Sequence, residues 1–146
     1  MMPESPAPPE AAHSPDARHV FVYGTLRRGG SNDINRLVPA PRYVGMGEVQ
    51  GCLYRIDWYP GLTLGGQDAV TVVGEVYEID PPLEAVLDEI ECIDDGPDSE
   101  YFKRELPVEV DGRPILCLVY EVNPERVRGK QLIGHGDWIL FHPAQP

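Results

Sequence analysis

The sequence predicts an α+β domain in which a small, mostly antiparallel and bent β-sheet closes into a barrel, with one or two flanking helices. The 146 residues include 15 Gly and 16 Pro, a content typical of short strands joined by many turns. Several apolar runs rich in β-forming residues lie between these turns, and such runs favour a small barrel. One stretch has the apolar spacing of an amphipathic helix. The length corresponds to one domain with one core.

The first 17 residues, MMPESPAPPEAAHSPDA, differ in composition from the rest of the chain. Five of them are prolines, and almost none could pack into a core. This composition predicts a disordered segment, with extended polyproline geometry at Pro-Ala-Pro-Pro. The folded domain is therefore predicted to span residues 18–146, with no internal repeat.

The first half of this domain is predicted to be mostly strand. Residues 20–23 (VFVY) form a buried first strand bounded by a glycine. Residues 31–38 (SNDINRLV) have a polar cap and helical spacing, and predict a short helix ended by a proline. Residues 42–56 contain several glycines and predict a strand that bends or bulges, followed by a second strand. The Pro-Gly pair within residues 58–64 predicts a turn between apolar groups.

The middle of the chain holds the clearest strand and the clearest helix. Residues 70–79 (VTVVGEVYEI) alternate so that one face carries Val72, Gly74 and Val76. Residues 81–93 begin with proline, which suits the first turn of a helix. Four apolar residues then share one helix face, as expected for a helix packed on a sheet: Leu83, Val86, Leu87 and Ile90.

Two further strands and an irregular tail complete the predicted fold. Residues 102–110 and 115–122 have strand composition and are joined by Asp111-Gly112, a pair typical of tight hairpins. The tail, residues 123–146, is predicted to be irregular. Its compact GHGDWIL stretch places Trp138 where it could close one end of a barrel.

The charge of the chain argues against two classes of partner. With 24 acidic and 12 basic residues the net charge is −12, which would repel nucleic acid and anionic membranes. There is no apolar run of membrane-spanning length and no basic-then-apolar leader. Cys52, Cys92 and Cys117 lie far apart without a CxxC motif, which is typical of reduced thiols. Together these features predict a soluble, cytoplasmic protein.

The acidic run over residues 88–100 resembles a calcium-binding loop only superficially. Aligning Gly96 with the obligatory glycine of such a loop puts Ile93 and Phe102 at ligand positions. Most of these carboxylates are therefore predicted to form a solvated face. The four histidines have no metal-ligand spacing, and no serine lies in a GxSxG elbow. These spacings predict no dedicated metal site.

Glu91 differs from the other carboxylates in its place on the predicted helix. It lies at the edge of the apolar face, beside Ile90, whereas Glu84 and Asp88 are predicted to point further outward. A carboxylate at this edge can reach a pocket, lose part of its solvation and have its pKa raised. Spacing alone leaves Glu89 only slightly less well placed.

Four segments taken together, FVYGTLRRGG, GEVYEID, LDEIE and YFKREL, resemble the γ-glutamylcyclotransferase-like superfamily. The resemblance is closest to its AIG2-like branch, which contains γ-glutamylamine cyclotransferase and related bacterial proteins. The segments occur in the family's order between about residues 20 and 122. The resemblance implies a compact barrel with flanking helices and a reaction that uses neither metal nor cofactor.

The resemblance also implies a reaction and a site. A small γ-glutamyl compound would be cyclised to 5-oxoproline, with release of an amine or amino acid. Matched residue by residue, Tyr23, Gly24, Thr25 and Leu26 would bind the glutamyl part, and Glu91 would be the general acid and base. This chemistry needs a carboxyl that takes a proton from the attacking amine and returns one to the leaving amine. N–H donors beside a glycine turn would stabilise the intermediate's oxyanion.

The chain departs from the family pattern at two places. Cys92 follows the matched glutamate where relatives often have glycine. Relatives commonly have Tyr-x-Arg downstream, whereas this chain reads Tyr101-Phe102-Lys103-Arg104. Either Lys103 replaces the arginine, or Arg104 is displaced by one position and faces the other side of its strand. Tyr101 is retained as a candidate pocket residue.

Several functional alternatives remain open from the sequence. The substrate could be a γ-glutamyl amine, a γ-glutamyl amino acid or a γ-glutamyl group on a larger metabolite. A non-catalytic member of the fold could instead use the pocket to bind a small molecule. The sequence does not distinguish the leaving amine, the oligomeric state or the pathway.

Overall fold

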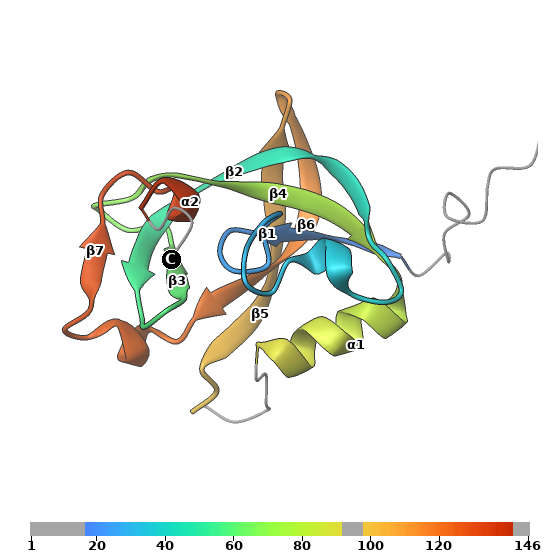
Figure 1. The fold of residues 1–146 in the computed structure, drawn as a ribbon. Coiled ribbons are helices and arrows are strands. Elements are labelled where there is room, and N and C mark those ends of the chain that lie inside the picture. The colour runs from blue at the N-terminus through green and yellow to red at the C-terminus, as the bar shows by residue number, and fades with distance from the viewer. Residues whose placement is uncertain (1–16, 92–97, 142–146) are drawn as a thin grey trace, which may run out of the picture.

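The computed structural model describes residues 17–91 and 98–141 (Figure 1). Apart from Ala17, the Pro-rich segment predicted at the start lies outside these residues. So do Cys92, Ile93, His13 and His142. The strands are β1 (Arg18–Val22), β2 (Arg42–Arg55), β3 (Pro60–Leu64), β4 (Val70–Ile79), β5 (Tyr101–Val110), β6 (Arg113–Val122) and β7 (Gln131–Ile133). The helices are α1 (Pro81–Ile90) and α2 (Trp138–Phe141), with 3₁₀ turns at Ile34–Arg36 and Pro124–Val127.

Five of the strands close into a barrel. Going round it, β1 pairs with β4, β4 with β2, β2 with β5, β5 with β6, and β6 again with β1. The closing pair β1–β6 is parallel, and the other four pairs are antiparallel. β3 and β7 flank the barrel on β2. The predicted fold class, a small, mostly antiparallel barrel with a flanking helix, is confirmed.

The barrel interior is filled by alternate residues of these strands. Phe21, Val72, Val76 and Val119 belong to one buried cluster, and each is fully shielded from solvent. Gly74 makes room for Phe21, because a Cβ at Gly74 would lie 2.8 Å from that ring and 2.2 Å from the Val22 carbonyl oxygen. Trp138, which the sequence places where it could close one end of the barrel, is buried and joins the same cluster.

The opposite face of β1, β4 and β6 carries a second apolar cluster, which α1 covers (Figure 1). Leu83 and Leu87 are fully buried there, and Val86 and Ile90 pack against its edge. The predicted apolar face of the helix is confirmed. Burial of this face fixes α1 along the barrel and places its C-terminal end, where Glu91 follows, near the end of β1.

The segment after β1 contains less helix than predicted. Only residues 34–36 form a 3₁₀ turn, and its N-cap is Asp33, whose side chain accepts from the Asn35 N–H. The reason lies in the loop before it: the Ile34 N–H donates to the Leu26 carbonyl at 2.9 Å, and the Asn32 N–H donates to that of Thr25 at 2.9 Å. These bonds fold the segment back onto the end of β1.

Pro60-Gly61 does not form the predicted turn. The chain reverses earlier, where the Ile56 N–H donates to the Tyr59 carbonyl at 3.0 Å, and Pro60 is already the first residue of β3. Proline is tolerated at that position because it does not need to donate to the ladder. β2 is one continuous strand with a register shift between Tyr43 and Gly45, rather than two strands.

The tail is more regular than its sequence suggests. β7 pairs with β2 through Leu53↔Ile133, although three residues are too short for a recognisable strand pattern. The hairpin at Asp111-Gly112 is confirmed, with φ of 51° and 79° at its two residues. Within the described part of the chain, no helix is long and apolar enough to cross a membrane.

Candidate active site

A cavity of about 240 Å³ opens between the end of β1, the β2–β3 turn, the end of α1 and the start of β5. All the residues that the sequence singled out for the site line it. They are Tyr23, Gly24, Thr25, Leu26, Glu91 and Tyr101. The segment Tyr23–Leu26 therefore meets Glu91 and Tyr101, which come much later in the sequence.

Glu91 is the carboxylate that the end of α1 presents to this cavity. Its backbone N–H donates to the Leu87 carbonyl at 2.9 Å, so the residue continues the last turn of the helix. Among the described residues, none donates a hydrogen bond to its carboxylate. Burial, together with the negative charge of Glu100, raises the pKa of Glu91 from its ordinary 4.5 to about 7. A carboxyl of this kind can take and return a proton near neutral pH.

The Gly24–Leu26 segment lies on the β1 side of the cavity. Its backbone N–H groups make no hydrogen bond to any residue within 17–91 or 98–141. Gly24 packs directly on Pro60, and a Cβ at Gly24 would lie 2.6 Å from the proline ring. The Asn32 amide donates to the Thr25 hydroxyl at 3.2 Å and holds this side chain. The segment therefore offers N–H donors in a loop whose shape depends on glycine.

Tyr23 and Tyr101 form walls of the cavity, with their hydroxyls committed to the backbone. The Tyr23 O–H donates to the Tyr120 carbonyl at 2.6 Å and accepts from the Leu62 N–H at 3.2 Å. The Tyr101 O–H donates to the Pro60 carbonyl at 2.7 Å. Burial is the main cause that raises the pKa of both hydroxyls, and the negative charge of Glu91 adds to it. Both rings therefore shape the cavity as neutral phenols.

Three further residues that line the cavity were not predicted from the sequence: Glu100, Trp58 and Tyr59. Glu100 belongs to the acidic run, most of which is predicted to be solvated, but it lines the cavity and its carboxylate accepts from the Tyr59 hydroxyl. Trp58 and Tyr59, which no sequence motif singled out, also line the cavity, and Trp58 is 53% exposed. Only the pairing of β3 with β2 and β6 brings this turn beside Glu100, and no local pattern encodes that pairing.

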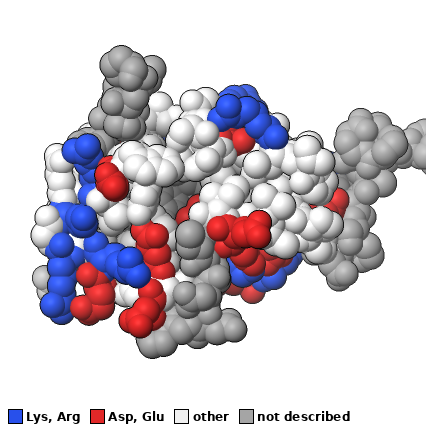
Figure 2. All heavy atoms as spheres, turned by 60° about the horizontal axis from the view of Figure 1, so that its bottom comes forward, with Lys and Arg blue, Asp and Glu red and all other residues white. Residues whose placement is uncertain are grey.

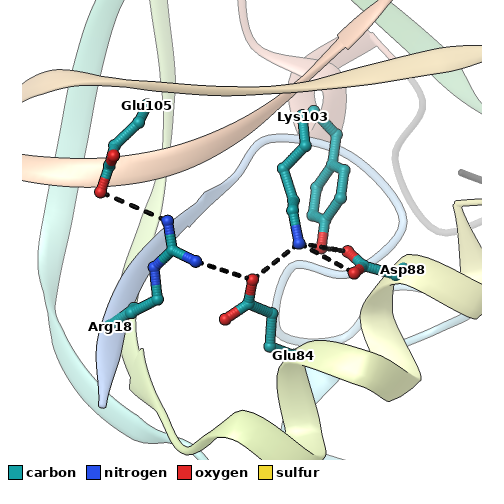
Figure 3. A network of polar contacts seen from close by, with 6 residues as sticks. Arg18, Glu84, Asp88, Lys103 and Glu105 are labelled. Carbon is teal, nitrogen blue, oxygen red and sulfur yellow. Dashed lines mark hydrogen bonds and ion pairs between the residues drawn. The ribbon is translucent and has the colours of Figure 1, made fainter. Parts of the chain in front are cut away.

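A polar network joins α1 to the start of β1 and to the β5–β6 hairpin (Figure 3). The Lys103 ammonium bonds to Glu84 at 2.6 Å and to Asp88 at 2.8 Å, and Arg18 bonds to Glu84 at 3.1 Å. The Tyr120 hydroxyl, whose ring lines the cavity, donates to Asp88 at 2.7 Å. Glu84 and Asp88 lie outside the cavity lining, unlike Glu91, but they are only partly exposed because β5 supplies a cation to this side of α1.

The network also shows which of the two basic residues, Lys103 or Arg104, lies on the same face of β5 as Tyr101. Lys103 lies on the α1 side, whereas Arg104 faces away and pairs with Glu121 at 2.9 Å. Lys103 is therefore the basic residue that shares a face of β5 with Tyr101. It does not reach the cavity but braces the helix that carries Glu91.

Replacing Lys103 with methionine is expected to lower the free energy of unfolding by about 1–3 kcal/mol, because Glu84 and Asp88 then lose a shared, half-buried cation. Arg104→Met is the matched control: Arg104 is 48% exposed, so its loss should cost about 0–1 kcal/mol. Urea denaturation of both variants measures the difference. Equal losses would show that the Lys103 network does not brace α1.

A second polar network is buried behind the Gly24–Leu26 loop. Arg27 and Glu75 are each 6% exposed and pair at 3.2 Å, and Arg27 also pairs with Asp137 at 3.0 Å. Glu75 accepts from the Tyr77 hydroxyl at 2.7 Å and from the Arg28 N–H at 2.9 Å. The network ties the loop to β4 and to the end of the chain.

Within residues 17–91 and 98–141, no group of three His, Cys, Asp or Glu side chains could hold a metal ion. Cys52 and Cys117 are buried free thiols, as the sequence predicts for these two. Burial raises the pKa of Cys117 to about 12, so that thiol stays protonated.

Comparisons with known proteins agree with this arrangement. A family model described as "Gamma-glutamyl cyclotransferase, AIG2-like" matches residues 20–140. The chain belongs to this family, and the resemblance seen in its motifs is confirmed. A Vibrio cholerae protein, provisionally named a gamma-glutamylcyclotransferase, is 36% identical over 121 residues, which cover 82% of this chain and 93% of that protein.

Two mouse proteins extend the comparison. A gamma-glutamylaminecyclotransferase of Mus musculus is 31% identical over 121 residues, covering 70% of this chain and 76% of the mouse protein. The crystal structure of an AIG2-like protein from Mus musculus superposes with a TM-score of 0.69 at 28% identity, over 87% of this chain and 89% of that one. The family therefore acts on γ-glutamyl compounds, and this chain shares its fold.

Proposed function

We propose that this protein is a cyclotransferase that converts a small γ-glutamyl compound to 5-oxoproline and a free amine, with Glu91 as general acid and base. The observation that supports this most is one cavity that holds two complementary features. A carboxyl with a pKa of about 7 stands on one side, and backbone N–H groups without a protein acceptor in the described chain stand on the other.

The first step of the proposed reaction is an attack within the substrate. Glu91, ionised, takes a proton from the substrate's α-ammonium, and the freed amine attacks the γ-carbonyl carbon of the same molecule. A C–N bond forms, and the carbonyl oxygen becomes an oxyanion. The Gly24–Leu26 N–H groups would donate to this oxygen, where fixed donors are most effective. Enclosure of the substrate between Tyr23 and Tyr101 would hold its chain bent for ring closure.

The second step breaks the amide bond. Glu91, now protonated, gives its proton to the nitrogen of the leaving amine, and the tetrahedral intermediate collapses as the C–N bond to that amine breaks. In total the α-ammonium loses two protons as it becomes the lactam N–H, and the leaving nitrogen gains two as it becomes an ammonium, so the protons balance. No water is consumed, and the products are 5-oxoproline and an ammonium ion. One carboxyl with a pKa near neutrality suffices for both transfers.

Release of 5-oxoproline by the purified protein tests the proposal. We expect product from at least one of three substrate types: a γ-glutamyl alkylamine, a γ-glutamyl dipeptide or the side-chain γ-glutamyl isomer of lysine. If none of these reacts, a larger γ-glutamyl conjugate is the next substrate to assay. Tight binding of 5-oxoproline without turnover of any of them would contradict catalysis and favour a binding protein.

The proposal also predicts the pH dependence of kcat/KM. Glu91 must be ionised to accept the first proton, so kcat/KM should rise with pH and level off above about 7, the pKa of Glu91. Glu100→Gln removes the negative charge that helps to raise this pKa, and should move the rise to lower pH. A profile that is flat from pH 5 to 8, or that is unaffected by Glu100→Gln, would contradict the assigned role of Glu91.

A further inference from the structure

One end of the cavity has the composition of a cation-binding site. Glu100 lies there, and its carboxylate accepts from the Tyr59 hydroxyl through Oε2. Its other oxygen, Oε1, accepts no hydrogen bond from the described residues. The backbone is fixed as well, because the Glu100 carbonyl accepts from the Asn123 N–H at 2.8 Å. Glu100 is therefore held in place, and its Oε1 can accept a hydrogen bond from a ligand.

The Tyr59 hydroxyl contacts this carboxylate, and the Tyr59 ring packs against that of Trp58. The Trp58 and Tyr59 rings lie 5.1 Å apart between centroids, at 84° to each other. Both line the cavity, and Trp58 is 53% exposed, which places it at the mouth. Aromatic faces next to a carboxylate attract ammonium groups through both charge and the ring quadrupole.

Among the described residues that line the cavity, none is Lys, Arg or His, so no cation there balances Glu91 and Glu100. Arg126 is near enough for its positive charge to lower the pKa of the Tyr59 hydroxyl. However, its side chain is exposed, does not line the cavity and donates to the Asp98 carbonyl at 2.8 Å. On the face shown in Figure 2, acidic side chains border the central recess. A carboxylate on the leaving group would meet only negative charge here.

We propose that Glu100, presented by Tyr59 beside Trp58, selects the leaving amine by its charge. The preferred substrate is a γ-glutamyl amide of a diamine: one nitrogen is released by cyclisation, and the second, an ammonium, bonds to Glu100. Leaving groups that carry a carboxylate at this position are rejected. The inference rests on the proposed function for the orientation of the substrate, with the glutamyl part at Gly24–Leu26 and the leaving amine toward the mouth.

Three γ-glutamyl amides of equal length test this selection. Their amines are 1,4-diaminobutane, pentylamine and 5-aminopentanoate, which place a cation, a methyl group and a carboxylate at the same position. We expect kcat/KM to fall in that order, with the diamine amide favoured over the pentylamine amide by about tenfold or more, the scale of a charge-assisted hydrogen bond. In Glu100→Gln this preference should shrink toward unity.

The ratio between substrates separates selection from catalysis. Glu100→Gln also changes the pKa of Glu91, but that change affects all three substrates alike and cancels in the ratio. Glu89 is an exposed carboxylate on α1, so Glu89→Gln is the control for a lost charge and should keep the wild-type ratio. Turnover without a preference for the diamine, or a preference that persists in Glu100→Gln, would overturn the inference and leave the proposed function standing.

Binding measurements cover the case in which no substrate reacts. Calorimetry would then compare the diamine and pentylamine amides on the wild type and on Glu100→Gln. Tighter binding of the diamine amide that is lost in Glu100→Gln would support the cation site, although the proposed catalysis would have failed. If neither amide binds, or both bind equally, the inference is wrong.

Discussion

Replacing Glu91 with glutamine should reduce the rate of 5-oxoproline formation by at least about a hundredfold, the scale of general acid–base catalysis. Glutamine keeps the size and polarity of the side chain but can neither accept nor return the proton. Substrate binding should change little, because the N–H groups of Gly24–Leu26 and the tyrosine walls remain. The rate is measured by product release at saturating substrate, and Glu89→Gln serves as the control on the same helix.

Glu91→Gln should also be more stable than the wild type above pH 7. The pKa of Glu91 is higher in the folded protein, about 7, than its ordinary 4.5, so the folded state loses stability as pH rises between these values. Glutamine has no such loss, and the expected gain at pH 8 is on the order of 1–3 kcal/mol. A fully active Glu91→Gln variant, or one destabilised at pH 8, would contradict the account of this site.

The largest expected loss of stability comes from Arg27→Met. Arg27 and Glu75 are almost completely buried, and removing the guanidinium leaves Glu75 with its charge but without its cation. Breaking a buried ion pair in this way costs about 3–5 kcal/mol. The Tyr77 hydroxyl and the Arg28 N–H still donate to Glu75, which favours the lower part of that range. Denaturant unfolding measures the loss.

A double variant distinguishes a buried unpaired charge from lost packing. In Arg27→Met/Glu75→Gln no charge remains at position 75, so the double variant should be more stable than Arg27→Met alone. Asp137, the other partner of Arg27, is less buried and should tolerate the change better. If the second substitution brings no recovery, the loss in Arg27→Met comes from packing and the assigned ion-pair role is wrong.

Local patterns in the sequence were sufficient for β1, β4, α1 and the β5–β6 hairpin. Alternation over residues 70–79 gives the two faces of β4, one inside the barrel and one under α1. Asp111 and Gly112 have the positive φ values that the hairpin needs. The meeting of Tyr23–Leu26 with Glu91 came from family motifs rather than from periodicity, since spacing alone did not separate Glu91 from Glu89.

What the sequence missed depends on contacts between distant segments. Glu100 looked like one more solvated carboxylate, because its environment is set by the β2–β3 turn some forty residues earlier, through Tyr59. Glu84 and Asp88 looked exposed because their cation, Lys103, comes from another strand. Pro60-Gly61 has turn composition, yet the pairing of β3 with β2 draws it into a strand. None of these interactions can be recognised from the neighbouring residues in the sequence.

The central claim is that the cavity promotes attack of the substrate on its own γ-carbonyl. A γ-glutamyl amide labelled with ¹³C at that carbonyl tests it directly by NMR during turnover. The account predicts that the amide signal is replaced by the lactam signal of 5-oxoproline, and that the lactam forms in the wild type but not in Glu91→Gln. Appearance of the carboxylate of free glutamate, which requires attack by water, would contradict it.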